Sequence, residues 1–560
     1  MDYKQQIAAL LTPYLPQEEA YQMLTPPKDV AMGDVCLPCF RLAKTLKKSP
    51  VAIAEQIVAE IAKPDFVERV TAVAGYVNFK YAASAFARDV VGKVLQEGAD
   101  YGKSNVGGGR HVCVDYSSIN IAKPFHIGHL STTVLGAAIC RLYDELGYRS
   151  VGINHLGDWG TQFGKLIVAY KLWSDREEIE KGGVRKLVDI YVRFHREAEE
   201  NPALDDQARA WFKRLEEGDR EAYELWQWFK QITLADDMPV YERLGVHFDS
   251  LAGESFYNDK MQAVIDELNE KGLLVDSQGA KIVELEGMAP CIIVKSDGAT
   301  LYATRDLAAA KYRKETYDFA KCLYVVAYQQ NLHFKQVFAV LDKMGYPWAK
   351  DMQHVAFGMV SLEEGAMSTR KGNAVWLTDV IDKAVARAKE IILEKSPNLA
   401  DTDAVAEKVG VGAVIFSALQ NGRIKDIEFK YDKLLNFDGE TCPYVQYTHA
   451  RCLSVLAKAG TADYAEADYG SLSDDVSKDI VRYLDRYPAL LVDAADKCEP
   501  SMITRHMVDL CKLYNKFYFD NKILQAEPSV RAARLALTRA TATLIENGAR
   551  ILGLPLPDKM

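Results

Sequence analysis

A short apolar run followed by a longer amphipathic run dominates the hydrophobic pattern of residues 112–147. The first run, Val112–Tyr116, is largely β-branched or apolar and predicts a buried strand. Gly147 then stands where a helix would end. Before it, five apolar residues recur at helical spacing: Val134, Leu135, Ala138, Leu142 and Leu146. The pattern therefore predicts a strand, a loop and a helix, with the loop at the carboxyl end of the strand.

Further strand patterns follow and indicate a parallel sheet. Residues Arg149–His155 predict the second strand. Residues Leu301–Asp306 predict the start of another helix. Three later apolar runs predict more strands of the same sheet: Cys291–Val294, Leu323–Val326 and His354–Val360. Strands that alternate with helices at this spacing favour an α/β fold with a doubly wound, Rossmann-like parallel sheet. Its ligands would bind at the carboxyl ends of the strands.

The flanking segments differ from this central part. Near the N-terminus, Ser49-Pro50 predicts a helix start, and Val67–Tyr81 predicts two strands broken at Gly75. From about residue 440 the pattern is helical, and Gly553 and Pro555 end its last helix. An apolar stripe marks that helix: Leu537, Thr541, Leu544, Ile545, Gly548, Ile551 and Leu552. We expect an α/β module over residues 1–105, a catalytic domain over 106–375 with an insertion at about 175–290, a connecting segment over 376–440 and a helical domain over 441–560.

Composition sets the broad class of the protein. It has 560 residues, 49% of them hydrophobic, and a net charge of −10, which is ordinary for a globular protein with sizeable cores. No apolar run approaches the ~18 residues of a membrane span, and the N-terminus lacks the pattern of a secretion signal. We therefore expect a cytoplasmic protein with no membrane partner. Ten cysteines are scattered along the chain, and only Cys36 and Cys39 are closely spaced, so reduced thiols are favoured over a redox or metal site.

Two histidines in the loop after the first strand are the first candidates for chemistry. His126 and His129 would lie at the start of the predicted helix, where unpaired N–H groups and the helix dipole attract phosphate. Gly128 between them allows a flat ring to approach the backbone. They could also be metal ligands, but the zinc-protease motif spaces its histidines four apart and has an adjacent Glu. Buried structural histidines remain the other alternative.

These motifs together resemble the class I aminoacyl-tRNA synthetases, and among them the arginyl-tRNA synthetase family. His126–His129 matches the H-I-G-H signature, and Ser117–His129 matches most of the arginyl pattern around it. Four more family motifs follow in order, and the similarity covers nearly the whole chain: His155–Gly164, Tyr302–Asp306, Gln329–His333 and Pro443–Arg451. Met367-Ser368 stands where the K-M-S-K-S loop belongs.

The resemblance implies an arginine–tRNA ligase that activates arginine with ATP and Mg²⁺ and then transfers it to tRNA(Arg). The expected partners are L-arginine and tRNA(Arg), the expected form is a monomer, and no protein metal site is expected. ATP would contact His126, Gly128, His129, Met367 and Ser368. The catalytic charges and donors would be Lys123, His126, His129, Arg370 and Lys371. Arginine would contact Asp115, Asn120, His155, Tyr302, Asp306 and Gln330.

The two carboxylates in the last group suit a guanidinium, which is planar, always charged and costly to bury without a partner. Asp306 is the best candidate and Asp115 the second. The alternative is that each forms an ion pair with an arginine of the protein itself, such as Arg305.

The sequence also departs from the family pattern. The K-M-S-K-S loop reads Ala366–Arg370 and lacks both lysines. The lysine before H-I-G-H is thought to replace them in arginyl enzymes, and Lys123 occupies that place. We therefore expect activation to require bound tRNA. Ile119 replaces the usual proline, and Arg370-Lys371 could be only an exposed basic turn.

The C-terminal segment carries candidate RNA contacts. Residues 505–560 hold nine basic and five acidic residues, a net charge of +4 within an acidic chain. Four aromatic residues alternate there with lysines 512, 516 and 522: Tyr514, Phe517, Tyr518 and Phe519. They could stack on anticodon bases, as the resemblance implies, although aromatics at helical spacing are more often core. Two other functions remain open, a nucleotidylyltransferase of the same fold and a paralogue that binds tRNA without charging it.

Overall fold

The computed structural model describes residues 3–362, 375–436, 439–460 and 463–560. The chain forms two compact units, and each is described by itself. The first unit contains residues 1–101, 448–488 and 509–547, and the second contains residues 102–447, 489–508 and 548–560. The proposed Met367, Ser368, Arg370 and Lys371 contacts fall in 363–374 and lie outside the described residues.

A four-stranded parallel sheet forms the centre of the second unit. Its strands are β4 (His111–Asp115), β5 (Arg149–Ile153), β9 (Lys321–Tyr324) and β10 (Met352–His354), in the order β10-β9-β4-β5. The chain crosses from β4 to β5 in one direction and later returns to place β9 on the other side of β4. The strand order therefore reverses between β4 and β9, which is where ligands of doubly wound sheets bind. The predicted α/β fold is confirmed.

Two predicted strands lie elsewhere. Cys291–Val294 is β8, but it belongs to a separate antiparallel sheet with β6 (Val275–Ser277) and β7 (Ala280–Val283). Alternate residues of β8 are buried, as in a strand with one covered face, and the short apolar run alone could not show which sheet it would join. The predicted strand at 354–360 was also wrong. The chain instead forms β10 and, after a break, β11 (Val360–Leu362), which pairs with β12 (Ile427–Phe429).

The helix after β4 is more deeply buried than its pattern indicated. α6 (Leu130–Glu145) buries polar residues such as Thr132 and Thr133 as well as the apolar stripe. Because α15 (Thr402–Leu419) also packs against it, no broad face of α6 is left for water. Gly147 follows the helix with φ of +78°, as expected for a residue that reverses the chain there.

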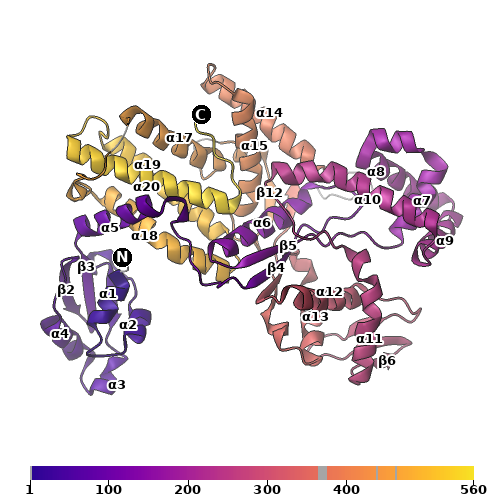
Figure 1. The fold of residues 1–560 in the computed structure, drawn as a ribbon, viewed down its shortest axis with the longest axis horizontal. Coiled ribbons are helices and arrows are strands. Elements are labelled where there is room, and N and C mark those ends of the chain that lie inside the picture. Colours follow the sequence, from indigo (N-terminus) through magenta and orange to yellow (C-terminus); the bar gives the residue numbers. More distant parts are fainter. Residues whose placement is uncertain (1–2, 363–374, 437–438, 461–462) are drawn as a thin grey trace. The chain divides into compact units, whose positions relative to one another are not determined.

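The insertion after β5 is mainly helical, as predicted. Its helices α7 (Gln162–Trp173), α8 (Arg176–Glu200), α9 (Ala203–Glu216) and α10 (Arg220–Arg243) pack on one another (Figure 1). Trp226 is buried among them. The chain continues through η4 (Glu254–Lys260) and α11 (Met261–Glu270) to the small antiparallel sheet.

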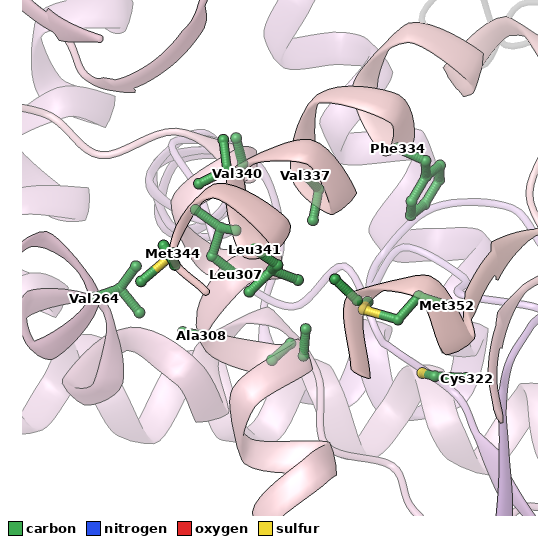
Figure 2. Close-up of a cluster of buried hydrophobic side chains, with 14 of the residues drawn as sticks. Val264, Leu307, Ala308, Cys322, Phe334, Val337, Val340, Leu341, Met344 and Met352 are labelled. Atoms are coloured by element: carbon green, nitrogen blue, oxygen red, sulfur yellow. The ribbon is translucent and has the colours of Figure 1, made fainter. Parts of the chain in front are cut away.

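An apolar core joins two further helices, α12 (Tyr302–Tyr317) and α13 (Asn331–Lys343), to the parallel sheet. Figure 2 shows Leu307 and Ala308 of α12 gathered with Val337, Val340 and Leu341 of α13. Cys322 of β9 and Met352 of β10 belong to the same cluster. The core thus fixes the two helices on which Asp306 and His333 stand. Two short 3-10 turns, η5 (Tyr328–Gln330) and η6 (Pro347–Asp351), flank α13.

The remaining elements of the second unit are helical. They are α14 (Leu377–Lys395) and α16 (Tyr431–Leu434), together with parts of the C-terminal helices. Those helices are α17 (Cys442–Ala459), α18 (Asp475–Asp496), α19 (Ser501–Asp520) and α20 (Pro528–Leu552), and η8 (Tyr469–Ser471) lies between α17 and α18. The predicted stripe along α20 is buried, and the helix ends before Gly553, whose φ is +73°.

The N-terminal part of the first unit has a three-stranded antiparallel sheet of order β1-β3-β2. Its strands are β1 (Val35–Pro38), β2 (Val67–Val73) and β3 (Tyr76–Tyr81), and Gly75 turns the chain between the last two. The accompanying helices and turns are α1 (Tyr3–Leu10), α2 (Gln17–Met23), η1 (Val30–Met32), α3 (Leu42–Leu46), α4 (Pro50–Glu60), α5 (Ala83–Glu97) and η2 (Gly98–Asp100). Ser49 caps α4 by accepting a hydrogen bond from Ala52 N, as predicted.

Two negative findings apply to the residues that the structure describes. No helix among them is both long and apolar enough to cross a membrane. No cluster of three or more acidic, histidine or cysteine side chains there could hold a metal ion. All ten cysteines, including Cys36 and Cys39, are buried free thiols.

Candidate active site

The loop between β4 and the helix start has a constrained backbone. Ser117, Ser118 and Ala122 all have positive φ, at 69°, 48° and 56°, which is uncommon for residues other than glycine. Hydroxyl groups hold this conformation: Ser117 N donates to Thr132 Oγ1, and Ala122 N donates to Thr233 Oγ1 of α10. Backbone strain of this kind persists only where the surroundings enforce it, so α6 and α10 together fix the loop.

His126 and His129 bond to the backbone in a reciprocal pair. They bracket a 3-10 turn, η3 (Ile127–His129), which runs directly into α6. Gly128 N donates to His126 Nδ1 at 3.1 Å, and His126 N donates to His129 Nδ1 at 3.2 Å. The two rings stack with centroids 4.0 Å apart. Since each Nδ1 accepts a hydrogen bond, each Nε2 must carry the proton of the neutral ring.

Both imidazoles are therefore neutral donors. Burial lowers the pKa of His126. Burial also lowers the pKa of His129 well below its usual value, and the nearby charges of His126 and Lys123 act in the same direction. Two Nε2–H groups at the start of a helix can each donate a hydrogen bond to an oxygen of phosphate. This geometry suits phosphate better than metal, because a metal ligand needs a free lone pair.

The chain after residues 363–374 returns to this turn. Ile127 N donates to Val375 O at 3.1 Å, and Leu377 N donates to Phe125 O at 2.9 Å. Residues 375–377 therefore lie antiparallel to residues 125–127. Residues 375–377 are thus anchored to the first signature segment by backbone hydrogen bonds.

Asp115, at the carboxyl end of β4, is held by the protein. Its Oδ2 lies 2.7 Å from Arg313 Nη2, and its Oδ1 accepts from the Ser118 hydroxyl. The side chain of Arg313 is only 1% exposed. The alternative that Asp115 pairs with an arginine of the chain is therefore realised, but with Arg313 of α12, whereas Arg305 contacts Glu254.

Asp306 has a different partner. Its Oδ2 accepts a hydrogen bond from His333 Nε2 of α13 at 2.6 Å. Burial by itself would raise the pKa of Asp306, but the hydrogen bond and charge of His333, with His155 and Arg313, outweigh burial and hold the pKa below its usual value. Asp306 is therefore ionised at neutral pH.

The other residues that we predicted to contact arginine differ in how far they are exposed to solvent. His155 lies with the carboxylates, because Arg313 Nη2 is 3.4 Å from its Nδ1, and burial lowers the pKa of its ring. Asn120 pairs with Gly157 across the strand ends. Tyr302 begins α12 and is 67% exposed, and Gln330 ends η5 and is also exposed. The structure thus brings Asp115, Asp306 and His155 together but leaves Tyr302 and Gln330 in contact with solvent.

Glu254, which the sequence did not indicate, belongs to the same charged group. Its Oε2 lies 3.6 Å from Arg305 Nη1. Burial raises the pKa of Glu254 to about 7; nearby Asp306 and Asp158 add to this shift, and Arg305 and Lys123 oppose it. Lys123 therefore lies within electrostatic reach of both Glu254 and His129.

Asp158 of the His155–Gly164 motif links segments around the site. It is fully buried, accepts from Lys230 Nζ of α10 at 2.6 Å and also accepts from Ser255. The motif thereby joins the helical insertion to η4, next to Glu254. Sequence reasoning missed Arg313 and His333 as site residues, although Arg313 follows Asp306 by seven positions and so shares its helix face.

Three models of protein families match the chain. The first describes "tRNA synthetases class I (R), catalytic domain" and matches residues 90–431. The second is the DALR anticodon binding domain, at residues 445–560, and the third is the arginyl tRNA synthetase N terminal domain, at residues 1–81. The first model alone spans more than half of the chain.

Known proteins of full length are also similar. The arginine–tRNA ligase of Alkaliphilus metalliredigens is 50% identical over the whole of both chains. That of Clostridioides difficile is 52% identical over 98% of this chain and 97% of its own. Among solved structures, the Thermus thermophilus arginyl-tRNA synthetase matches with a TM-score of 0.83 at 25% identity, and the match covers all of both chains. By the family model over residues 90–431 and by relatives about 50% identical over nearly the whole chain, this chain belongs to the arginyl-tRNA synthetases, the arginine–tRNA ligases of class I.

Proposed function

We propose that this chain activates arginine with ATP to arginyl-adenylate and then transfers the arginyl group to the terminal ribose of tRNA(Arg). The observation that supports it most is the ionised Asp306, which lies near the strand-order reversal that also presents the neutral His126 and His129 donors. A carboxylate for a guanidinium and donors for phosphate are the two recognition elements that the first step requires.

On the ATP side, His126 and His129 donate through Nε2 to phosphate oxygens, and Gly128 allows the adenine ring to approach. Lys123 supplies positive charge, which its reach to His129 supports. Met367, Ser368, Arg370 and Lys371 complete this side as predictions from the sequence. Mg²⁺ would be held mainly by the phosphates of ATP, because it keeps water ligands and needs few protein contacts. When bound, Mg²⁺ neutralises phosphate charge.

On the arginine side, Asp306 receives the guanidinium. Asp115 contributes negative charge but has both carboxylate oxygens engaged by Arg313 and Ser118. His155 packs beside the pair and limits the space. Asn120, Tyr302 and Gln330 are proposed contacts for the rest of the amino acid, and the exposure of Tyr302 and Gln330 leaves both free to contact a ligand. Lysine would bind poorly because an ammonium cannot make the two-pronged contact.

In the first unit, α19 presents the proposed anticodon contacts. Tyr514 and Phe517 are buried, so the core alternative holds for them. Tyr518 is partly exposed with Arg451 stacked 5.0 Å from its ring centre, and Phe519 is 88% exposed. A ring and a guanidinium of this kind can stack on bases splayed from an RNA loop. The N-terminal module is proposed as a further tRNA contact, and the working form as a monomer.

The proposed function is tested by tRNA charging with each of the twenty amino acids, and arginine alone should be transferred. Binding of tRNA without charging at saturating arginine would contradict the proposal and favour a non-charging paralogue.

A second measurement tests the proposed order of events. Because the loop lacks both lysines and Lys123 takes their place, ATP–pyrophosphate exchange should need tRNA. Equal exchange rates with and without tRNA would contradict this requirement but not the ligase activity.

A further inference from the structure

Asp306 and its histidine partner form a pair that a ligand can open. His333 Nε2 donates to Asp306 Oδ2 at 2.6 Å, and the two side chains are 23% and 21% exposed. They stand on neighbouring helices, α13 and α12, whose apolar faces share one core (Figure 2). The helices are thus fixed, but the contact between the polar side chains remains open to solvent.

The pair differs from the fixed contact of Asp115. Arg313 is 1% exposed, and its Nε and Nη1 have no hydrogen-bond partner. Removing Asp115 from Arg313 would leave an unpaired buried charge, which costs several kcal/mol. The imidazole of His333 is easier to displace, because its side chain already reaches water and makes a single hydrogen bond to Asp306.

We propose that His333 is a positioning residue that occupies the guanidinium site of Asp306 in the free enzyme and is displaced when arginine binds. This inference rests on the proposed function. His333 offers one N–H to one carboxylate oxygen, whereas a guanidinium offers two parallel N–H groups to both oxygens. Arginine therefore replaces a single charge-assisted hydrogen bond with two. Before arginine arrives, His333 keeps the carboxylate ionised and oriented.

The exchange predicts how the arginine KM depends on the side chain at position 333. Arginine must break the bond between His333 and Asp306 before the guanidinium can bind, so this bond raises the KM. A side chain that cannot donate a hydrogen bond removes the competition.

The test is the arginine KM in tRNA-supported ATP–pyrophosphate exchange, with the full chain and saturating ATP. His333→Ala removes the competitor, so its KM should lie about three- to tenfold below that of the unchanged protein. The variant His333→Gln keeps an N–H donor, so its KM should stay within about twofold of that of the unchanged protein.

A control variant makes the result specific. His354→Ala removes the neighbouring imidazole, which bonds to Val326 O and not to Asp306. Its arginine KM should therefore stay within about twofold of that of the unchanged protein.

Two outcomes would overturn the proposal. One is an arginine KM in His333→Ala that equals that of the unchanged protein, because the imidazole would then not compete with arginine. The other is a KM that rises in His333→Ala, because His333 would then help to bind arginine. Arginine charging by the unchanged protein tests the proposed function separately, so either result can be assigned to His333.

Discussion

Two carboxylates of the candidate site carry the same charge and differ in the side chain that balances it. Asp306 on α12 is held by His333, and both side chains reach solvent. Asp115 at the end of β4 is held by Arg313, which water hardly touches. The imidazole of His333 can withdraw into solvent, whereas Arg313 cannot leave Asp115 without becoming an unpaired buried cation.

The difference separates recognition from architecture. A substrate guanidinium can take the place of the imidazole at Asp306, but it cannot take the place of Arg313 at Asp115. The same residue type therefore has two proposed roles: Asp306 would bind arginine, while Asp115 holds Arg313, which also contacts His155. Four predictions test this separation.

The largest effect is expected for Asp306→Asn. The amide keeps the shape but loses the charge opposite the guanidinium, so kcat/KM for arginine in pyrophosphate exchange should fall about 1,000-fold. The KM for ATP should change less than about threefold. The matched control is Asp318→Asn, at the other end of α12, where the side chain is 89% exposed and pairs with Lys314. An Asp306→Asn enzyme with normal arginine kinetics would remove Asp306 from the site.

The second prediction concerns Asp115→Asn, which leaves the Arg313 charge buried without its carboxylate. The free energy of unfolding should fall by about 3 kcal/mol, measured by urea denaturation. The double variant Asp115→Asn with Arg313→Met removes the stranded cation and should recover part of this loss. If Asp115→Asn were as stable as the unchanged protein while its arginine KM rose as far as that of Asp306→Asn, the two carboxylates would have the same role.

The third prediction concerns Lys123, which we expect to act on the phosphates of ATP and not on arginine. Lys123→Gln removes a positive charge next to His129, so kcat for exchange should fall about 30-fold because phosphate charge is less well balanced. The arginine KM should stay within about twofold. A rise in the arginine KM without loss of kcat would show that Lys123 acts on the arginine side instead.

The smallest effect concerns Glu254, whose pKa burial raises to about 7. Between its ordinary pKa and about 7 the folded state binds more protons than the unfolded state, so stability falls as the pH rises. Glu254 should therefore lower the free energy of unfolding by about 1 kcal/mol more at pH 8 than at pH 6. Urea denaturation of Glu254→Gln at both pH values should lack this decline. If both proteins showed the same decline, another group would be its cause.

Local patterns predicted most elements of the fold. Ser49 caps α4, Gly75 separates β2 from β3, and the apolar stripe of α20 ends before Gly553, because each depends on neighbours in the chain. The errors concern strands whose place depends on which other strand they pair with. Cys291–Val294 forms a strand as predicted, but its partners are β6 and β7, and the run at 354–360 breaks after His354. A short apolar run carries no information about its neighbour in the sheet.

In the candidate site, too, local sequence predicted some features and contacts between distant segments decided the others. Sequence motifs pointed to His126, His129, Asp115 and Asp306, since each lies at the end of a strand or the start of a helix. They did not indicate which side chain balances which carboxylate, and Arg305 was the wrong arginine for Asp115. Glu254 had no signal, because η4 reaches the site through the insertion.

The sequence by itself determined the α/β class, the family and the residue types of the site. These features depend on hydrophobic periodicity and on motifs of neighbouring residues. The tertiary structure decided the tautomers of His126 and His129, through backbone donors that reach each Nδ1. It also decided that Asp115 contacts Arg313 and Asp306 contacts His333. Charge balance in a protein interior depends on which side chains from distant segments are buried together and how much water reaches them, and no local pattern contains that information.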